Sequence, residues 1–314
     1  MKKDSNPSVA IILVNWNGFE FTRACLVSLS RIDYLNHQIF VIDNGSTDDS
    51  VQKLKEGFQN ITLLENKSNL GFTGGNNLGI NAAIQANFDL VLLLNNDTEV
   101  EPDFLSNLVD FQQANPEYGI VQPLILFNQE RDVIWSGGGK FQTWLGRSKT
   151  IADRDPLNQY SNEVHKDLDW ATGCCMLVPA YIFKKVGLLN DSFFAYFEDV
   201  DFSLRVVEFG YKIGLEPKAV IYHEAGAASK KQSSEGQLSP TVFYLTARNQ
   251  LFQLRLHTKF PHYLVAWPYQ IFKFLIWITY FCLRLRIRKV KAVIFGLYDG
   301  LSKDPKSQEL LPPR

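Results

Sequence analysis

The sequence predicts an α/β fold in which helices flank a mostly parallel central sheet, followed by a helical C-terminal segment. Short apolar runs rich in branched residues alternate with stretches of helix length over the first third of the chain, which is typical of parallel strands covered on both faces. Polar residues follow these runs at Asn15, Asp43 and Asp97. Because such sheets bind ligands beyond the carboxyl ends of their strands, these polar ends predict the binding site.

The elements of the first half follow from these runs. We expect strands at 9–14, 38–42, 61–64 and 90–94, helices that end near residues 30 and 86, and a further helix after Asp48 and Asp49. A segment rich in glycine and asparagine, 69–79, leads into the helix that ends near residue 86.

The second half is more irregular. We expect strands at 119–127 and 171–178, a helix from about 199 to 209, and a strand that leads to His223. The segment 225–239 is rich in Ser, Gly, Ala and Lys, which predicts a mobile loop.

Composition limits the possible functions. The 314 residues are 46% hydrophobic, and 32 basic side chains nearly balance 33 acidic ones, which argues against nucleic-acid binding. The four cysteines have no metal-ligand spacing, so we expect buried thiols in a reducing compartment. The apolar run at 9–14 is too short for a signal peptide, so we expect the chain to stay in the cytoplasm.

Two acidic residues at strand ends are candidates for ligand binding. Asp97 could hold Mg²⁺ or Mn²⁺, which would neutralise a substrate diphosphate, and Asp43 could accept hydrogen bonds from a nucleobase or ribose. Aspartates are also common in turns at strand ends, so at this stage both interpretations stay open. Gly71 lies in a segment whose small residues would let a ligand approach the backbone, or would let a loop pack on a helix.

A second acidic group lies in the run 196–202, where three acids stand among aromatic residues. An apolar surrounding can raise the pKa of Glu198 or Asp199 toward that of a useful general base. The alternative is an ordinary helix start, with Asp201 paired to Arg205 on the helix surface. His223 could be a metal ligand, although a single histidine is more often structural.

Taken in order, these motifs resemble family 2 glycosyltransferases, in particular the bacterial rhamnosyltransferase-like branch. The resemblance covers most of residues 8–250 and is carried by the segments 14–18, 41–48, 69–79, 94–97 and 197–201, and by Tyr222 and His223 with Gly226. It implies the GT-A fold and a catalytic domain at 1–250, with a nucleotide-binding half at about 1–100 and an acceptor half at about 101–250. Beyond it we expect a helical membrane-associating region at 251–314.

The resemblance also implies roles for particular residues. Asp97, the last residue of a DXD-like motif, and His223 would bind Mg²⁺ or Mn²⁺, and Asp199 would be the catalytic base of an inverting reaction, with Glu198 as the second choice. The residues implied in nucleotide-sugar binding are Asn15, Asn17, Asp43, Gly71, Asn76, Asn96 and Arg248. These assignments require Asp97, Asp199 and His223 to converge on one cleft.

The chain departs from the family pattern in two places. Asn95 stands where many relatives have an acid, so metal binding would depend more on Asp97. The Gln-x-x-Arg-Trp motif of processive synthases is missing, which favours the transfer of a single sugar. The resemblance suggests a dTDP- or UDP-linked donor, with rhamnose favoured, and a glycan or lipid-linked acceptor in cell-surface polysaccharide synthesis.

The segment 263–283 is nearly long enough to span a bilayer, but Pro268 and Lys273 interrupt it. A single span would separate the catalytic domain from the basic cluster at 284–291, and both belong on the cytoplasmic side. We therefore expect an in-plane or re-entrant anchor at the inner face of the cell membrane. The alternative is a soluble helix packed on the catalytic domain or on the partner of a homo-oligomer.

Two other functions stay open on the sequence alone. A sugar-phosphate nucleotidyltransferase would use a similar sheet and metal, but it usually has a loop rich in glycine and lysine after the first strand, which this chain lacks. A non-catalytic protein that binds a nucleotide sugar would lose little when Asp199 is replaced.

Overall fold

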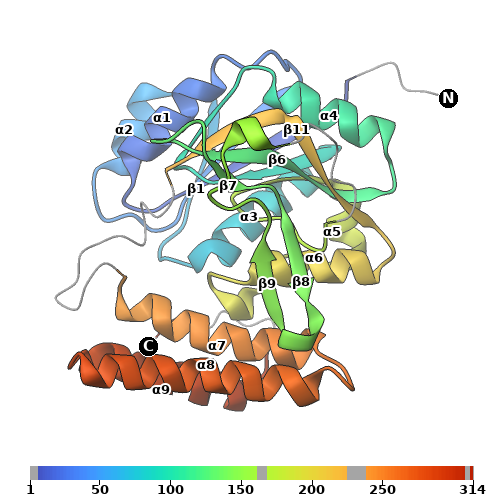
Figure 1. Ribbon diagram of the computed structural model, residues 1–314. Helices are drawn as coiled ribbons and strands as arrows, with labels where there is room; N and C mark the ends of the chain where they lie inside the picture. Colours follow the sequence, from blue (N-terminus) through green and yellow to red (C-terminus); the bar gives the residue numbers. More distant parts are fainter. Residues whose placement is uncertain (1–5, 161–167, 225–237, 308–311, 314) are drawn as a thin grey trace. The chain divides into compact units, whose positions relative to one another are not determined.

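The computed structural model describes residues 6–160, 168–224, 238–307 and 312–313 (Figure 1). The chain forms two compact units. One, the sheet unit, comprises Met1–Lys140, Thr150–Leu189 and Phe202–Ala225, and the other, the helical unit, comprises Phe141–Lys149, Asn190–Asp201 and Gly226–Arg314. The functional division expected at residue 250 stays a prediction.

The sheet unit is built on one mixed sheet, which confirms the predicted α/β class. Along its main path the strands lie in the order β3-β2-β1-β4-β10-β6-β11-β5, and β7 pairs with β6. The bounds are β1 Val9–Asn15, β2 His37–Asp43, β3 Ile61–Glu65, β4 Leu90–Leu94, β5 Thr98–Val100, β6 Tyr118–Phe127, β7 Ile134–Ser136, β10 Cys175–Pro179 and β11 Lys212–His223. The strands β1 to β4 pair in parallel, as do β6 and β11, whereas β10 is antiparallel to both of its neighbours.

Helices cover both faces of this sheet (Figure 1). Their bounds are α1 Phe19–Leu29, α2 Ser50–Gly57, α3 Gly71–Gln85, α4 Phe104–Ala114 and α5 Ala180–Val186, and α6 Glu198–Glu208 begins in the helical unit and ends in the sheet unit. Ile11 of β1 lies in the core formed with α1, α2 and α4, while Ile12 lies in the core formed with α3, α5 and the end of α6. This alternation follows from the period of two in a strand.

The glycine-rich segment 69–79 differs from the expectation, because the helix α3 already begins at Gly71. Its glycines let the helix pack closely on β1. A Cβ at Gly75 would lie 2.9 Å from a methyl carbon of Val14, and one at Gly79 would lie 2.6 Å from a methyl carbon of Ile12. Glycine usually weakens a helix, but here the missing side chains bring the helix and strand together.

Other boundaries shift where side chains replace strand pairing. The strand expected at 171–178 starts only at Cys175, since the backbone N–H of Ala171 donates to Ser203 and that of Thr172 donates to Gln122. The short pair of strands β8 Gly139–Gln142 and β9 Arg147–Thr150 was not among the predicted elements. The loop expected at 225–239, with Gly226, lies outside the described residues up to residue 237.

The helical unit contains α7 Pro240–His257, α8 Tyr263–Leu283 and α9 Ile287–Ser302. The helix α9 lies close to α7, because a Cβ at Gly300 would be 2.9 Å from the carbonyl oxygen of Arg248. The side chain of Lys273 turns into this unit, where its Nζ donates to Gln250 at 3.3 Å and lies 4.4 Å from the ring centroid of Phe274. Burial lowers the pKa of Lys273 to about 8.

Because Lys273 turns inward, it does not interrupt the outer face of α8. That face carries exposed apolar side chains spaced four or seven residues apart, at Val265, Phe272, Ile276 and Leu283. No helix in the described part of the chain combines the length and the apolar composition that a membrane crossing requires.

Candidate active site

The ends of β1 and β2 form a buried polar group in the sheet unit. Asn15 and Asp43 are register partners, and the Asn15 amide nitrogen donates to Oδ1 of Asp43 at 2.9 Å. Ser46 donates to Asp43 through its hydroxyl at 2.6 Å and its backbone N–H at 2.9 Å. Asn15 also accepts from the hydroxyl of Thr22 at 2.8 Å. The Asp43 carboxylate is therefore fixed in direction while its oxygens keep capacity for another donor.

Asn17 fixes the loop beside this group. Its backbone has φ +50°, its N–H donates to the Ser46 hydroxyl at 2.9 Å, and its side-chain oxygen accepts from the N–H of Thr47 at 2.8 Å. The first strand end and the turn after β2 are thus joined by side chains of both. This arrangement gives Asn17 a structural function in shaping the site.

The other residues implied in nucleotide-sugar binding also lie in the sheet unit, apart from Arg248. The N–H of Gly71, whose φ is +73°, donates to the side chain of Asn69 at 2.7 Å. The buried Asn76 donates to the carbonyl of Phe72 within the same helix, and Asn96 donates to the Thr22 hydroxyl at 2.8 Å. Asn96 thereby ties the end of β4 to α1.

Asp97 and His223 meet, although 125 residues separate them in the chain. The antiparallel register of β5 and β11 places Thr98 opposite His223, and the N–H of Glu224 donates to the carbonyl of Asp97 at 3.0 Å. The distance from Nε2 of His223 to Oδ1 of Asp97 is 3.2 Å. Trp135 packs edge-on against the His223 ring, with ring centroids 4.4 Å apart. Both side chains are largely buried.

The pair fits a divalent cation. Two ligand atoms bound to one ion at about 2.1 Å and at right angles lie about 3 Å apart, close to the separation seen here. The described residues contain no group of three or more His, Cys, Asp or Glu side chains that could hold a metal. Substrate oxygens and water would have to complete the coordination, as is usual for Mg²⁺ beside a phosphate.

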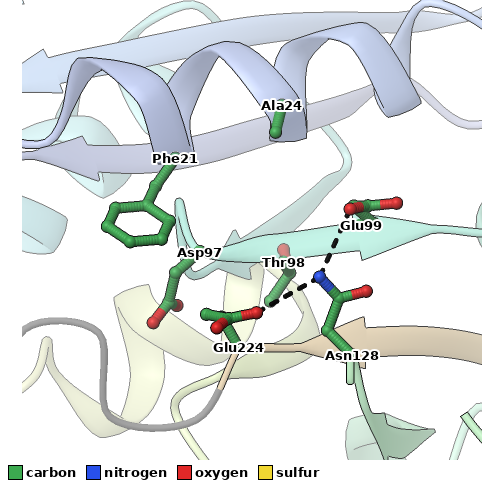
Figure 2. A pocket seen from close by; sticks show the side chains of 7 residues that line it. All are labelled: Phe21, Ala24, Asp97, Thr98, Glu99, Asn128 and Glu224. Carbon is green, nitrogen blue, oxygen red and sulfur yellow. Dashed lines mark hydrogen bonds between the residues drawn. The ribbon is translucent and has the colours of Figure 1, made fainter. Parts of the chain in front are cut away.

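A hollow of about 310 Å³ lies beside Asp97 (Figure 2). It is lined by Phe21 and Ala24 of α1 and by Asp97, Thr98, Glu99, Asn128 and Glu224. Asn128 donates to both Glu99 and Glu224 at 3.3 Å, and Arg131 contacts Glu99 at 2.7 Å. The acidic lining favours a cation or sugar hydroxyls over an anionic ligand.

Glu198 and Asp199 belong to the helical unit, at the start of α6. Glu198 is buried, and one of its carboxylate oxygens has no hydrogen-bond partner in the described structure. Burial, followed by the charges of Asp199 and Asp201, raises the pKa of Glu198 well above its usual value. Oδ1 of Asp199 accepts from the N–H of Val200 at 2.8 Å.

The loop that leads to these carboxylates is strained. Phe194, Tyr196 and Phe197 have φ of +63°, +71° and +73°. Such conformations cost a residue other than glycine about 1–3 kcal/mol each, so other contacts must hold them.

Arg248 lies in this unit and is completely buried. Its Nη2 donates to the carbonyl oxygens of Ser192 at 3.0 Å and Phe193 at 2.8 Å. Burial lowers the pKa of Arg248. Asp201, for which a surface pair with Arg205 was the alternative, lies 2.8 Å from Nε2 of His257, and Arg205 donates to the carbonyls of Val186 and Leu188.

The structure thus brings Asn15 to Asp43 and Asp97 to His223 within the sheet unit, and Glu198 to Asp199 within the helical unit. The convergence of Asp199 with the first group stays a prediction. Sequence reasoning missed Trp135, Asn249 and His257, none of which lies in a recognisable motif. For Asn249 the adjacent Arg248 was the only available signal.

Comparison with known proteins decides the family. The model of Glycosyl transferase family 2 matches residues 10–186, more than half of the chain. The chain belongs to this family. The predicted glycosyltransferase resemblance is therefore confirmed.

Two relatives of this glycosyltransferase have described activities. The low-salt glycan biosynthesis hexosyltransferase Agl10 of Haloferax volcanii is 29% identical over 207 residues, which cover 66% of this chain and 64% of the relative. The N-acetylglucosaminyl-diphospho-decaprenol L-rhamnosyltransferase of Mycobacterium tuberculosis is 26% identical over 246 residues, which cover 71% of this chain and 78% of the relative. The match therefore spans somewhat less than two thirds of the Haloferax enzyme.

Solved structures confirm the GT-A fold of this glycosyltransferase. The mannosyltransferase PcManGT of Pyrobaculum calidifontis, in complex with GDP-Man and Mn²⁺, has a TM-score of 0.58 at 14% identity, covering 96% of this chain and 89% of its own. GalNAc-T7, with UDP, GalNAc and Mn²⁺, has a TM-score of 0.62 at 16% identity, covering 81% of this chain and 48% of its own.

Proposed function

We propose that this glycosyltransferase transfers a single sugar, with rhamnose favoured, from a nucleotide diphosphate to a hydroxyl of a glycan or lipid-linked acceptor in cell-surface polysaccharide synthesis, with inversion at the anomeric carbon. The observation that carries the proposal is the contact of 3.2 Å between Asp97 and His223 at the edge of the sheet. The rhamnosyltransferase and hexosyltransferase relatives support the sugar and the acceptor class.

The donor nucleotide, dTDP or UDP, would lie at the ends of β1 and β2. The carboxylate of Asp43 is held by Asn15 and Ser46 and can accept one more hydrogen bond, for example from the N–H of a uracil or thymine ring. This fixed direction supports nucleobase recognition by Asp43.

Asp97 and His223 would hold Mg²⁺ or Mn²⁺. The bound ion would offset the negative charge of the diphosphate, which the acidic surroundings of Asp97 would otherwise repel. The Mn²⁺ in the two neighbouring structures supports a divalent cation for this chain.

Asp199 would accept the proton of the acceptor hydroxyl as that oxygen attacks the anomeric carbon. Glu198 is less suited to this step, because a carboxyl whose pKa is raised by burial keeps its proton to higher pH. The raised pKa of Glu198 supports Asp199 as the base.

A panel of nucleotide sugars tests the proposal, scored for Mn²⁺-dependent release of the nucleotide with and without lipid-linked acceptors. We expect Asp199→Asn to lower transfer by about 10²–10⁴-fold, the usual contribution of a general base, while nucleotide binding persists. Glu117→Gln, at an exposed carboxylate of the sheet unit, is the control and should retain activity. Full transfer by Asp199→Asn would refute the assigned base, whereas nucleotide-sugar binding without any transfer by the wild type would favour a non-catalytic binding function.

We also propose that the helical unit lies on the inner face of the cell membrane. Apolar side chains are exposed on α8 and again on α9, at Ile287, Ile294, Phe295, Tyr298 and Leu301. The exposed Arg284 lies between the two helices in the chain, and the exposed Arg288 and Lys291 lie near the start of α9. Apolar side chains flanked by cations fit an anionic lipid surface.

Flotation with vesicles of phosphatidylcholine, with or without phosphatidylglycerol, tests this location on the full chain. We expect binding to anionic vesicles, and a loss of about tenfold or more in the Phe272→Glu, Leu283→Glu double variant. Leu35→Glu, at an exposed position of the sheet unit, is the control. Equal flotation of the double variant would refute the anchor. If the wild type is a dimer and the same two substitutions make it monomeric, the apolar face serves self-association instead.

A further inference from the structure

The loop before Glu198 and Asp199 depends on contacts from the helix α7. With positive φ at Phe194, Tyr196 and Phe197, the segment would relax if it were free, because these residues favour negative φ. Relaxation would also move the first turn of α6, since the N–H of Asp201 donates to the carbonyl of Phe197 at 2.9 Å. The position of the two carboxylates is therefore tied to this loop.

Asn249 makes the contacts that the loop needs. Its side chain is completely buried, and its amide nitrogen lies 2.9, 2.8 and 2.8 Å from the carbonyl oxygens of Phe193, Ala195 and Tyr196. Its two N–H groups are shared among these three carbonyls, which a regular helix or strand would have paired with its own backbone.

Arg248 fixes the orientation of Asn249. Its Nε donates to Oδ1 of Asn249 at 2.9 Å, which turns the amide nitrogen toward the loop. Its Nη2 adds contacts to the carbonyls of Ser192 and Phe193. Because a buried cation is unfavourable unless it is hydrogen-bonded, these contacts account for a charged residue at a fully buried position.

We propose that Arg248 and Asn249 are positioning residues that hold the loop 193–197 in its positive-φ conformation and thereby fix the direction of the Asp199 carboxylate. The proposal rests on the proposed function of Asp199 as the base. Arg248 and Asn249 act through the loop and need not touch the substrate. His257, about two turns further along α7, adds a contact to Asp201 at 2.8 Å.

Asn249→Asp tests the proposal with little change in size. The new carboxylate would face carbonyl oxygens and would lose the donors that hold them. Gln253→Leu is the matched control, because Gln253 is fully buried on the same helix and its amide has no hydrogen-bond partner in the described structure. Kinetics should be paired with hydrogen exchange, which reports on the loop without requiring activity.

We expect Asn249→Asp to lower kcat by about tenfold or more while KM for the nucleotide sugar changes by less than about twofold. Amides at 194–201 should exchange faster, those of α9 should not, and Gln253→Leu should match the wild type. Unchanged kcat, or exchange raised as much in α9 as in the loop, would overturn the proposal. If the wild type transfers no sugar, the proposed function fails, whereas the exchange data still decide whether Asn249 holds the loop.

Discussion

The two units hold their acidic side chains in different ways. In the sheet unit, Asp43 and Asp97 stand at strand ends and are fixed by side chains from neighbouring strands, such as Asn15 and His223. In the helical unit, Glu198 and Asp199 follow a strained loop whose backbone carbonyls are held from α7. Strand ends therefore supply rigid positions directly, whereas a loop needs a second element to hold it.

Among substitutions that test this difference between the two units, we expect the largest effect on kinetics at Asp43. Asp43→Asn removes a charged acceptor that the neighbouring residues already hold in place, so KM for the donor should rise by about 10–100-fold, with kcat changed much less. Steady-state kinetics with the best donor of the panel measure both constants. An unchanged KM would show that the strand-end carboxylate does not bind the nucleotide.

A smaller effect concerns the packing that places the strand ends. Gly79→Ala puts a Cβ 2.6 Å from Ile12, so we expect a loss of about 1–3 kcal/mol, measured as a lower midpoint in urea. Gly57→Ala is the control, because a Cβ there meets nothing within 4 Å. It should be neutral or slightly stabilising. Equal stability of both variants would contradict the close contact of α3 with β1.

The smallest effect concerns the pH dependence of the helical unit. Since the pKa of Glu198 is raised in the folded state, the folded chain binds more protons than the unfolded chain above the usual range of a carboxyl. The contribution of Glu198 to stability therefore falls as the pH rises above the usual range of a carboxyl toward the folded-state pKa. We expect Glu198→Gln to gain stability relative to the wild type as the pH rises above the usual range of a carboxyl, measured by urea unfolding at each pH. A difference in unfolding free energy between the two proteins that does not change with pH would contradict the raised pKa of Glu198.

The same contrast explains what the sequence could predict. The strands that end at Asn15, Asp43 and Asp97 were visible because an apolar run followed by polar residues is a local pattern. The contact of Asp97 with His223 depends on the pairing of β5 with β11, which no local pattern specifies.

The helical unit was harder to predict. Arg248 and Asn249 bind backbone carbonyls. Every residue has a backbone carbonyl, so the sequence does not show which of them a buried side chain will bind. The start of α3 at Gly71 was not predicted, because glycine has a low helix propensity and the close packing of this helix on β1 cannot be seen in the sequence. In the sequence, Lys273 interrupts an apolar run. Its position on the inner face of α8 follows only from the packing of that helix.

The central claim is that Asp97 and His223 hold the cation that binds the donor diphosphate. Electron paramagnetic resonance of Mn²⁺ measures this directly, by titrating the ion into the wild type, Asp97→Asn and His223→Gln in the presence of UDP or dTDP. We expect saturable binding by the wild type and a loss of about tenfold or more in affinity in each variant. Equal Mn²⁺ affinity in all three proteins would show that Asp97 and His223 do not hold the cation.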